Sequence, residues 1–183
     1  MRALFLLSLL SLPAAAQQVP SLPASLSPDV AEVILARPDR FADLAADLIH
    51  GHGAGGAITP AAIETAIALD RAFFRTRALR PFHESDLDAD GRITAAEVTA
   101  RAAALSAPAR ARLMRDLAAA DADADNILSP AELATHAEAA VARASRPLDE
   151  ALLRAVAAFD DNADGQSSLS EITRALPVAL PAD

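Results

Sequence analysis

The sequence contains no cysteine, tryptophan or tyrosine, and all 16 of its basic residues are arginine. Without cysteine, no disulfide can form and no lipid can be attached to an N-terminal cysteine, so the fold must be held by a hydrophobic core, by bound metal, or by both. The net charge is -9, which argues against binding to nucleic acid or to an anionic membrane surface. This acidic balance suits a protein that binds cations.

Aromatic residues are also scarce, at 3% of the chain, although 52% of residues are hydrophobic. Alanine makes up much of that hydrophobic share, and alanine is the strongest helix former. A chain of 183 residues is long enough to bury a core as one domain or two small lobes. The composition therefore favours an all-α fold.

The first residues read MRALFLLSLLSLPAAAQQVP, with one positive charge, an apolar run and then small residues. This order is typical of a secretory signal peptide, and we expect residues 1–16 to be removed on export. The apolar run is too short to span a bilayer, and no second candidate span follows. We therefore expect a periplasmic or secreted protein in which residues 17–37 form a lead-in and a short helix.

Residues 86–97 read DLDADGRITAAE, with carboxylates at alternate positions and then a glycine. Like charges this close repel one another unless a cation lies among them. Alternate carboxylates lie on one side of an extended chain, and Gly91 permits the positive φ of a turn that wraps them round a centre. The stretch predicts a cation site.

Two further stretches repeat the pattern: residues 121–132 read DADADNILSPAE, and residues 160–171 read DDNADGQSSLSE. The three stretches follow one another at nearly regular intervals, and each interval leaves room for helices between them. Position 9 is Ser or Thr and position 12 is Glu in each stretch, which also makes a capping box for a following helix. The chain therefore reads as a helix-loop-helix repeat.

These three stretches resemble the calcium loop of the EF-hand family, including exported bacterial calmodulin-like proteins with several hands. The resemblance implies oxygen ligands at positions 1, 3 and 5, a backbone carbonyl at position 7, a hydroxyl or bridging water at position 9 and a bidentate glutamate at position 12. The implied ligands are Asp86, Asp88, Asp90, Arg92, Thr94 and Glu97; Asp121, Asp123, Asp125, Ile127, Ser129 and Glu132; and Asp160, Asn162, Asp164, Gln166, Ser168 and Glu171.

Proline marks where helices begin, because Pro108 precedes the loop 121–132 by the same interval as Pro147 precedes the loop 160–171. Pro38 precedes residues 51–62 by that interval too, and this stretch reads GHGAGGAITPAA, with the turn glycine but without the acidic ligands. We interpret it as a silent hand that pairs with the loop at 86–97. The alternative is a glycine-rich linker between helices.

Some residues depart from the family pattern. Asn126 replaces the glycine at position 6, and asparagine tolerates the left-handed region better than most residues. Ser167 replaces the apolar residue at position 8 of the third loop, where we expect it to meet Leu128 across a pair. Pro81 should break or bend the helix before the first loop.

The ligand chemistry selects among ions. An all-oxygen shell rich in carboxylates favours hard cations over zinc or copper, and Mg²⁺ prefers a smaller octahedral site. Exported lanthanide-binding EF-hand proteins are similar, but their loops carry Pro at position 2 and an acid at position 9, which this chain lacks. We therefore expect Ca²⁺, with lanthanide binding as an alternative.

Other functional sites have little support in the sequence. His50 and His52 lie close together in HGHG, but no third ligand accompanies them, so a transition-metal site there is weakly supported. The chain has no Gly-x-Ser-x-Gly, His-Glu-x-x-His or phosphate-loop motif, so we expect no enzyme activity.

The expected architecture is all-α, with EF-hand pairs in two lobes. Residues 38–105 would hold the silent hand 51–62 and the loop 86–97, residues 106–176 would hold the loops 121–132 and 160–171, and residues 177–183 would be a tail. Three functions remain open: a calcium sensor that opens to bind a protein partner, a calcium buffer, or a calcium-stabilised subunit of an exported assembly.

Overall fold

A computed structural model describes residues 21–177, which form eight α-helices, one 3₁₀ helix and four two-residue strands. The prediction of an all-α fold is confirmed. The predicted signal peptide 1–16 and most of the predicted tail lie outside the described residues. The elements are α1 (Pro28–Ala36), α2 (Pro38–His52), β1 (Ala57–Ile58), α3 (Pro60–His83), β2 (Ile93–Thr94), α4 (Ala95–Ala103), α5 (Ala107–Ala120), β3 (Ile127–Leu128), α6 (Pro130–Ala144), α7 (Pro147–Ala155), η1 (Val156–Phe159), β4 (Ser167–Ser168) and α8 (Leu169–Ala175).

Proline and hydroxyl side chains set the helix starts. Proline opens α1, α2, α3, α6 and α7, where its fixed φ suits the first turn and its missing N–H has no helical partner to lose. Thr94, Ser129 and Ser168 cap α4, α6 and α8, and each side chain accepts the backbone N–H of a glutamate three residues later. The predicted capping boxes are present in all three helices.

Helix α3 is the longest element, with 24 residues, and at 1.5 Å per residue it spans roughly 36 Å. Pro81 does not break the helix, because α3 runs on through Pro81 to His83. Phe82 is fully buried in this last turn, so packing holds the helix where proline removes a backbone bond. The other three loops are each preceded, 13 residues earlier, by a proline that starts a helix. The residue 13 positions before Asp86 is Phe73, so no proline starts a new helix before the loop 86–97.

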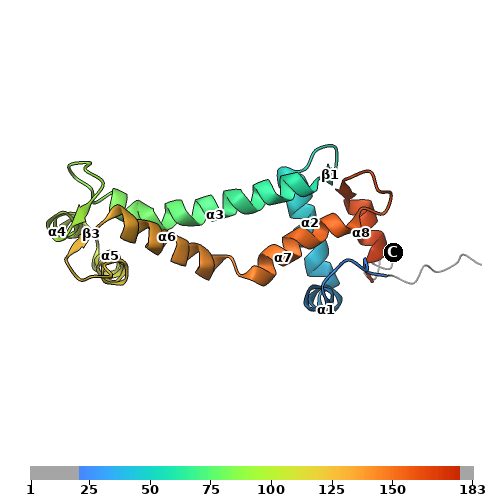
Figure 1. Ribbon diagram of the computed structural model, residues 1–183, viewed down its shortest axis with the longest axis horizontal. Helices are drawn as coiled ribbons and strands as arrows, with labels where there is room; N and C mark the ends of the chain where they lie inside the picture. Colours follow the sequence, from blue (N-terminus) through green and yellow to red (C-terminus); the bar gives the residue numbers. More distant parts are fainter. Residues whose placement is uncertain (1–20, 178–183) are drawn as a thin grey trace, which may run out of the picture.

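The strands pair in a nested order, β1 with β4 and β2 with β3, both antiparallel. The expected pairing of residues 51–62 with the loop 86–97 is therefore wrong. Because α3 is continuous, it carries these two loops to opposite ends of the molecule (Figure 1). Ser167 lies opposite Ile58 rather than near Leu128, and Leu128 lies opposite Ile93.

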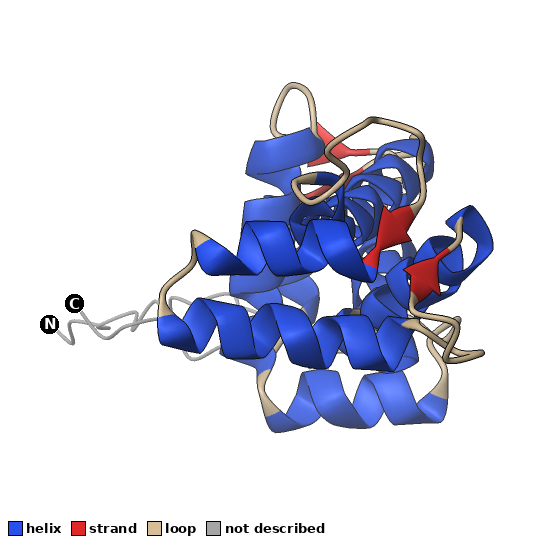
Figure 2. Cartoon of the chain, turned by 90° about the vertical axis from the view of Figure 1, so that its left-hand side faces the viewer, coloured by secondary structure: helices blue, strands red, loops and turns tan. Residues whose placement is uncertain are grey.

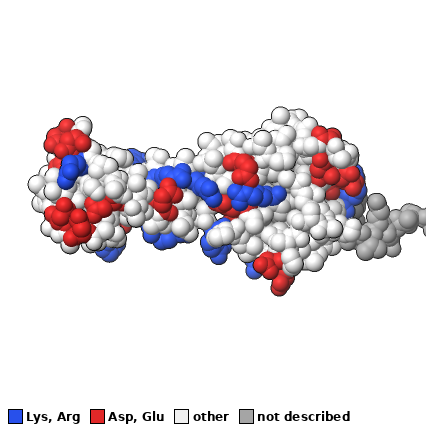
Figure 3. Space-filling view, viewed as in Figure 1, with Lys and Arg blue, Asp and Glu red and all other residues white. Residues whose placement is uncertain are grey.

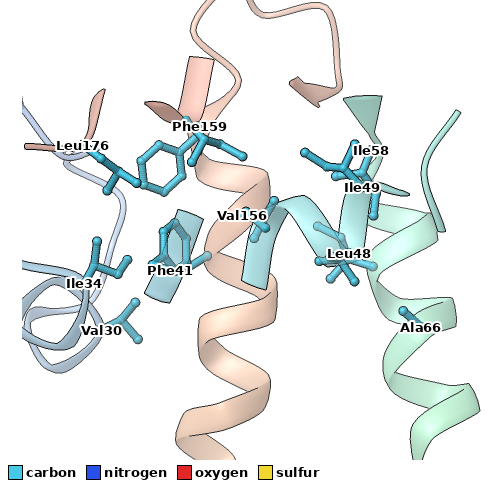
Figure 4. Close-up of a cluster of buried hydrophobic side chains, with 14 of the residues drawn as sticks. Val30, Ile34, Phe41, Leu48, Ile49, Ile58, Ala66, Val156, Phe159 and Leu176 are labelled. Carbon is cyan, nitrogen blue, oxygen red and sulfur yellow. The ribbon is translucent and has the colours of Figure 1, made fainter. Parts of the chain in front are cut away.

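Two hydrophobic clusters of buried residues lie at the two ends. The first core, shown in Figure 4, joins α1, α2 and the start of α3 to α7, η1 and α8, and its Phe41 and Phe159 rings are 5.4 Å apart. The second core joins the end of α3 to α4, α5 and α6 around Phe82, Ile93 and Leu128. Figure 2 views the molecule from the end that carries α4 and α5, with the strands in red.

Between the two cores, α3 lies beside α6 and α7 (Figure 1). Glu150 of α7 is only 6% exposed, and its two carboxylate oxygens accept hydrogen bonds from Arg71 of α3 at 2.8 and 2.7 Å. Arg154 also donates to Glu150, at 3.2 Å, and Ser145 donates at 3.3 Å. The hydrogen bond from Arg71 is the main cause that lowers the pKa of Glu150, so the carboxylate stays charged. We call Glu150, Arg71, Arg154 and Ser145 the Glu150 clasp.

In the part of the chain that the structure describes, every helix is too short or too polar to cross a membrane.

Replacing Glu150 by alanine should lower the free energy of unfolding by about 2 kcal/mol, because it leaves Arg71 without its buried partner. Chemical denaturation would measure the loss. The matched control is E138A, since Glu138 of α6 also pairs with an arginine of α3, Arg75, but is largely exposed, and its loss should be clearly smaller. Equal losses in the two variants would show that the Glu150 clasp stabilises the fold no more than an exposed ion pair does.

Candidate metal centres

Two groups of three carboxylates are brought together by the fold. Oxygen atoms of Asp86, Asp88 and Glu97 all lie within 4.8 Å of one another. The same is true of Asp121, Asp123 and Glu132 in the second loop. Because β2 pairs with β3, both groups lie at the same end of the molecule. Acidic side chains gather at the two ends in the space-filling view (Figure 3).

The backbone of each loop curls inward because aspartate oxygens accept its N–H groups. In the first loop Asp86 accepts from Gly91 at 3.1 Å, Asp88 from Asp90 at 3.2 Å, and Asp90 from Arg92 at 2.7 Å. The second loop repeats these bonds at the matching positions. Each aspartate therefore uses one oxygen to shape the loop.

Positive φ angles complete the turns. At position 6 the φ angles are 79° for Gly91, 64° for Asn126 and 85° for Gly165, so asparagine does occupy the left-handed region there. Position 4 is also left-handed in all three loops, where Ala89, Ala124 and Ala163 have φ of 60°, 61° and 57°. Alanine is disfavoured in this conformation by roughly 1–2 kcal/mol, so each loop holds strain at the same place. Nothing in the sequence pattern pointed to these alanines.

One carboxylate oxygen in each of the first two loops has no partner. Asp86 Oδ1 and Asp121 Oδ1 are buried and accept no hydrogen bond from the described residues. Burying a polar atom without a partner costs free energy, and the cost is greater for a charged group. Both atoms belong to the carboxylate groups just described, so the unmet acceptors lie where a cation would bind.

The glutamates at position 12 close these groups from the following helix. Glu97 Oε2 accepts the N–H and hydroxyl of Thr94 at 2.8 and 2.7 Å, and Oε1 accepts the N–H of Leu87 at 2.9 Å. These hydrogen bonds lower the pKa of Glu97 to about 2. The largest effect comes from the backbone N–H of Thr94, followed by the Thr94 hydroxyl and the backbone N–H of Leu87. Bonds from the backbone N–H groups of Ser129 and Ala122, then from the Ser129 hydroxyl, lower the pKa of Glu132 to about 2.

The third loop is arranged differently. Both oxygens of Asp160 accept backbone N–H groups, from Asp164 at 3.1 Å and from Gly165 at 2.8 Å, so neither is left over. Asn162 supplies an amide in place of a carboxylate and donates to Asp164 at 3.1 Å. Glu171 is capped like the other two glutamates, and the Ser168 hydroxyl is the main cause that lowers its pKa. Within residues 21–177, three carboxylates converge only in the first two loops.

The remaining sequence-predicted ligands take part in other hydrogen bonds. Hydroxyls of Thr94, Ser129 and Ser168 donate to their capping glutamates at 2.7, 2.8 and 2.6 Å. The residues at position 7 were expected to bind metal through their backbone carbonyls. Their backbone N–H groups donate to the aspartates at position 5. These residues are Arg92, Ile127 and Gln166.

The glycine-rich stretch 51–62 brings no acid to its loop. A side chain at Gly53 would collide with the carbonyl oxygens of Ile49 and Ala57, so only glycine fits there. Ala54 and Ala57 form a bridge that tightens the turn. His50 and His52 join no group of metal-ligating side chains within the described residues. The stretch therefore serves as the strand partner of the third loop.

Comparisons of the chain with models of protein families, with curated proteins and with solved structures find no match.

The lowered pKa values of Glu97 and Glu132 predict an acid-sensitive term in the stability of the metal-free protein. A carboxyl whose pKa is lowered on folding stabilises the folded state at pH values above its ordinary pKa of 4.5. This contribution disappears as the pH falls to the lowered pKa of about 2. The E97Q/E132Q variant loses the term, so its Tm should fall less than that of the wild type between these pH values.

Thermal unfolding of metal-free protein across this pH range would measure the effect. The control is E32Q, which removes an exposed glutamate from α1. The prediction fails if E97Q/E132Q and the wild type lose the same number of degrees.

Proposed function

We propose that this chain is an exported EF-hand protein that binds Ca²⁺ through the loops 86–97, 121–132 and 160–171. The observation that carries the proposal is the pair of buried, unpartnered oxygens of Asp86 and Asp121 within groups of three carboxylates. Hard cations prefer such oxygen shells, and Ca²⁺ tolerates the irregular geometry of a flexible loop. Lanthanides share this chemistry and are the alternative ions.

The loops should not bind equally. The first two loops each present three converging carboxylates and one unmet oxygen, whereas the third presents Asn162 and an aspartate whose oxygens are already satisfied. A cation at the third loop would have to compete with those hydrogen bonds. We therefore expect two tighter sites, joined through β2 and β3, and one weaker site beside a silent hand at 51–62.

Among the three roles, calcium storage or calcium-dependent stabilisation is favoured over sensing. Opening a lobe to a partner would require the helices that flank its loops to separate. Here α3 and α6 lie along each other, Arg75 pairs with Glu138 between them, and the Glu150 clasp ties α3 to α7. After the expected removal of residues 1–16, Met114 would be the only methionine, so a methionine-rich partner groove is absent from the sequence.

Calorimetric titration of metal-free protein with Ca²⁺ should detect three sites, two of them tighter. E97Q and E132Q should each remove a tighter site, and E171Q should remove the weaker one, because an amide cannot supply a bidentate charged ligand. A site at one hundred times its dissociation constant adds about 2.7 kcal/mol to the stability, so Ca²⁺ should also raise the Tm. No uptake of Ca²⁺ or La³⁺ near millimolar concentrations would refute the proposal.

A fluorescent dye that binds exposed apolar surface separates storage from sensing. If the braced helices keep both cores closed, dye fluorescence should stay the same when saturating Ca²⁺ is added. The unfolded protein serves as the positive control for dye binding. A large increase with Ca²⁺ alone would instead support the sensor.

A further inference from the structure

A hollow of about 260 Å³ lies between α3, α5 and α6, on the side of the second core. Phe74, Ala78 and Pro81 form its wall on α3, and Ala140 and Ala144 contribute small side chains from α6. No residue of the three proposed calcium loops lines it. The hollow is therefore separate from the metal centres.

Each of the three helices contributes one arginine to this hollow: Arg77 from α3, Arg112 from α5 and Arg143 from α6. Asp116 is the only acid among the lining residues, and it lies 3.7 Å from Arg112. Within residues 21–177, Arg77 and Arg143 form no ion pair. An excess of positive charge at one hollow is unexpected in a chain of net charge -9.

A second hollow of about 350 Å³ continues from the first and shares Arg77, Pro81, Arg112 and Asp116 with it. Its further lining includes apolar side chains, Leu105, Ala109 and Leu113. Arg80, Arg101 and Glu84 also line it, and both arginines already pair with Glu84. The two hollows together offer unpaired guanidinium groups beside an apolar surface.

Guanidinium groups bind carboxylates through paired, charge-assisted hydrogen bonds. An apolar chain placed over Leu105 and Ala109 would add hydrophobic stabilisation, because it removes apolar surface from water. Asp116 would repel a doubly charged head group more strongly than a singly charged one. We infer that Arg77, Arg112 and Arg143 form a binding site for an organic monoanion, a carboxylate with a short apolar chain. We call it the arginine site.

Octanoate is a suitable probe, because it joins one carboxylate to a short apolar chain. Calorimetric titration of the purified protein, with and without Ca²⁺, should show one octanoate per chain. The R77Q/R143Q variant should bind octanoate at least about tenfold more weakly, since it loses two charge-assisted contacts. Octyltrimethylammonium, with a similar chain and the opposite charge, should not bind.

The matched control is R37Q/R40Q, which removes the same charge from exposed arginines at the other end of the molecule. Its affinity for octanoate should stay within about twofold of the wild type. Circular dichroism would verify that both variants are folded. No binding of octanoate at millimolar concentration, or equal weakening in the two variants, would overturn the inference. Because the titration is also run without Ca²⁺, its result is independent of the proposed calcium sites.

Discussion

The antiparallel pairing of four two-residue strands organises this structure. A strand of two residues cannot be stable alone, so each loop needs a partner whose backbone accepts its hydrogen bonds. Ile93 and Leu128 lie opposite each other in one pair and are both fully buried, so the pairing also closes the second core. The other pair joins Ile58 to Ser167, whose buried hydroxyl has no partner among the described residues. Each pair therefore fixes two loops and the helices that follow them.

The carboxylate groups depend on that pairing. Strand β2 leads directly into α4 and strand β3 into α6, so Glu97 and Glu132 are held facing the aspartates of their own loops. Each of the first two loops contains three unfavourable features. Three carboxylates share a small volume, one buried oxygen of Asp86 or Asp121 has no partner among the described residues, and an alanine is held at positive φ. A bound cation would relieve the first two of these costs at once.

The acidic and basic side chains are arranged differently at the ends and in the middle of the molecule. Acids gather at the ends, around the loops, while along the middle arginines lie beside glutamates and tie α3 to α6 and α7 (Figure 3). The arginine site draws on α3, α5 and α6. A cation bound at an end and an anion bound at the arginine site would thus contact different side chains while sharing the same helices.

The helical class, the helix starts and the residues of each acidic loop could all be predicted from short sequence patterns. These features are local: a proline at the first turn, a capping hydroxyl three residues before a glutamate, and aspartates at alternate positions act over a few residues. Asn126 at positive φ was likewise foreseeable from its own side chain.

Which loops pair could not be predicted from these patterns, because pairing depends on how far α3 carries the chain. Helix α3 continues through Pro81, since burial of Phe82 and contact with α6 stabilise its last turns. That continuity nests the pairs, places Ser167 opposite Ile58 and leaves the third loop with a partner that has no acids. It also brings together Arg77, Arg112 and Arg143, which lie far apart in the sequence on three different helices. Contacts between distant residues follow from packing, which no short pattern encodes.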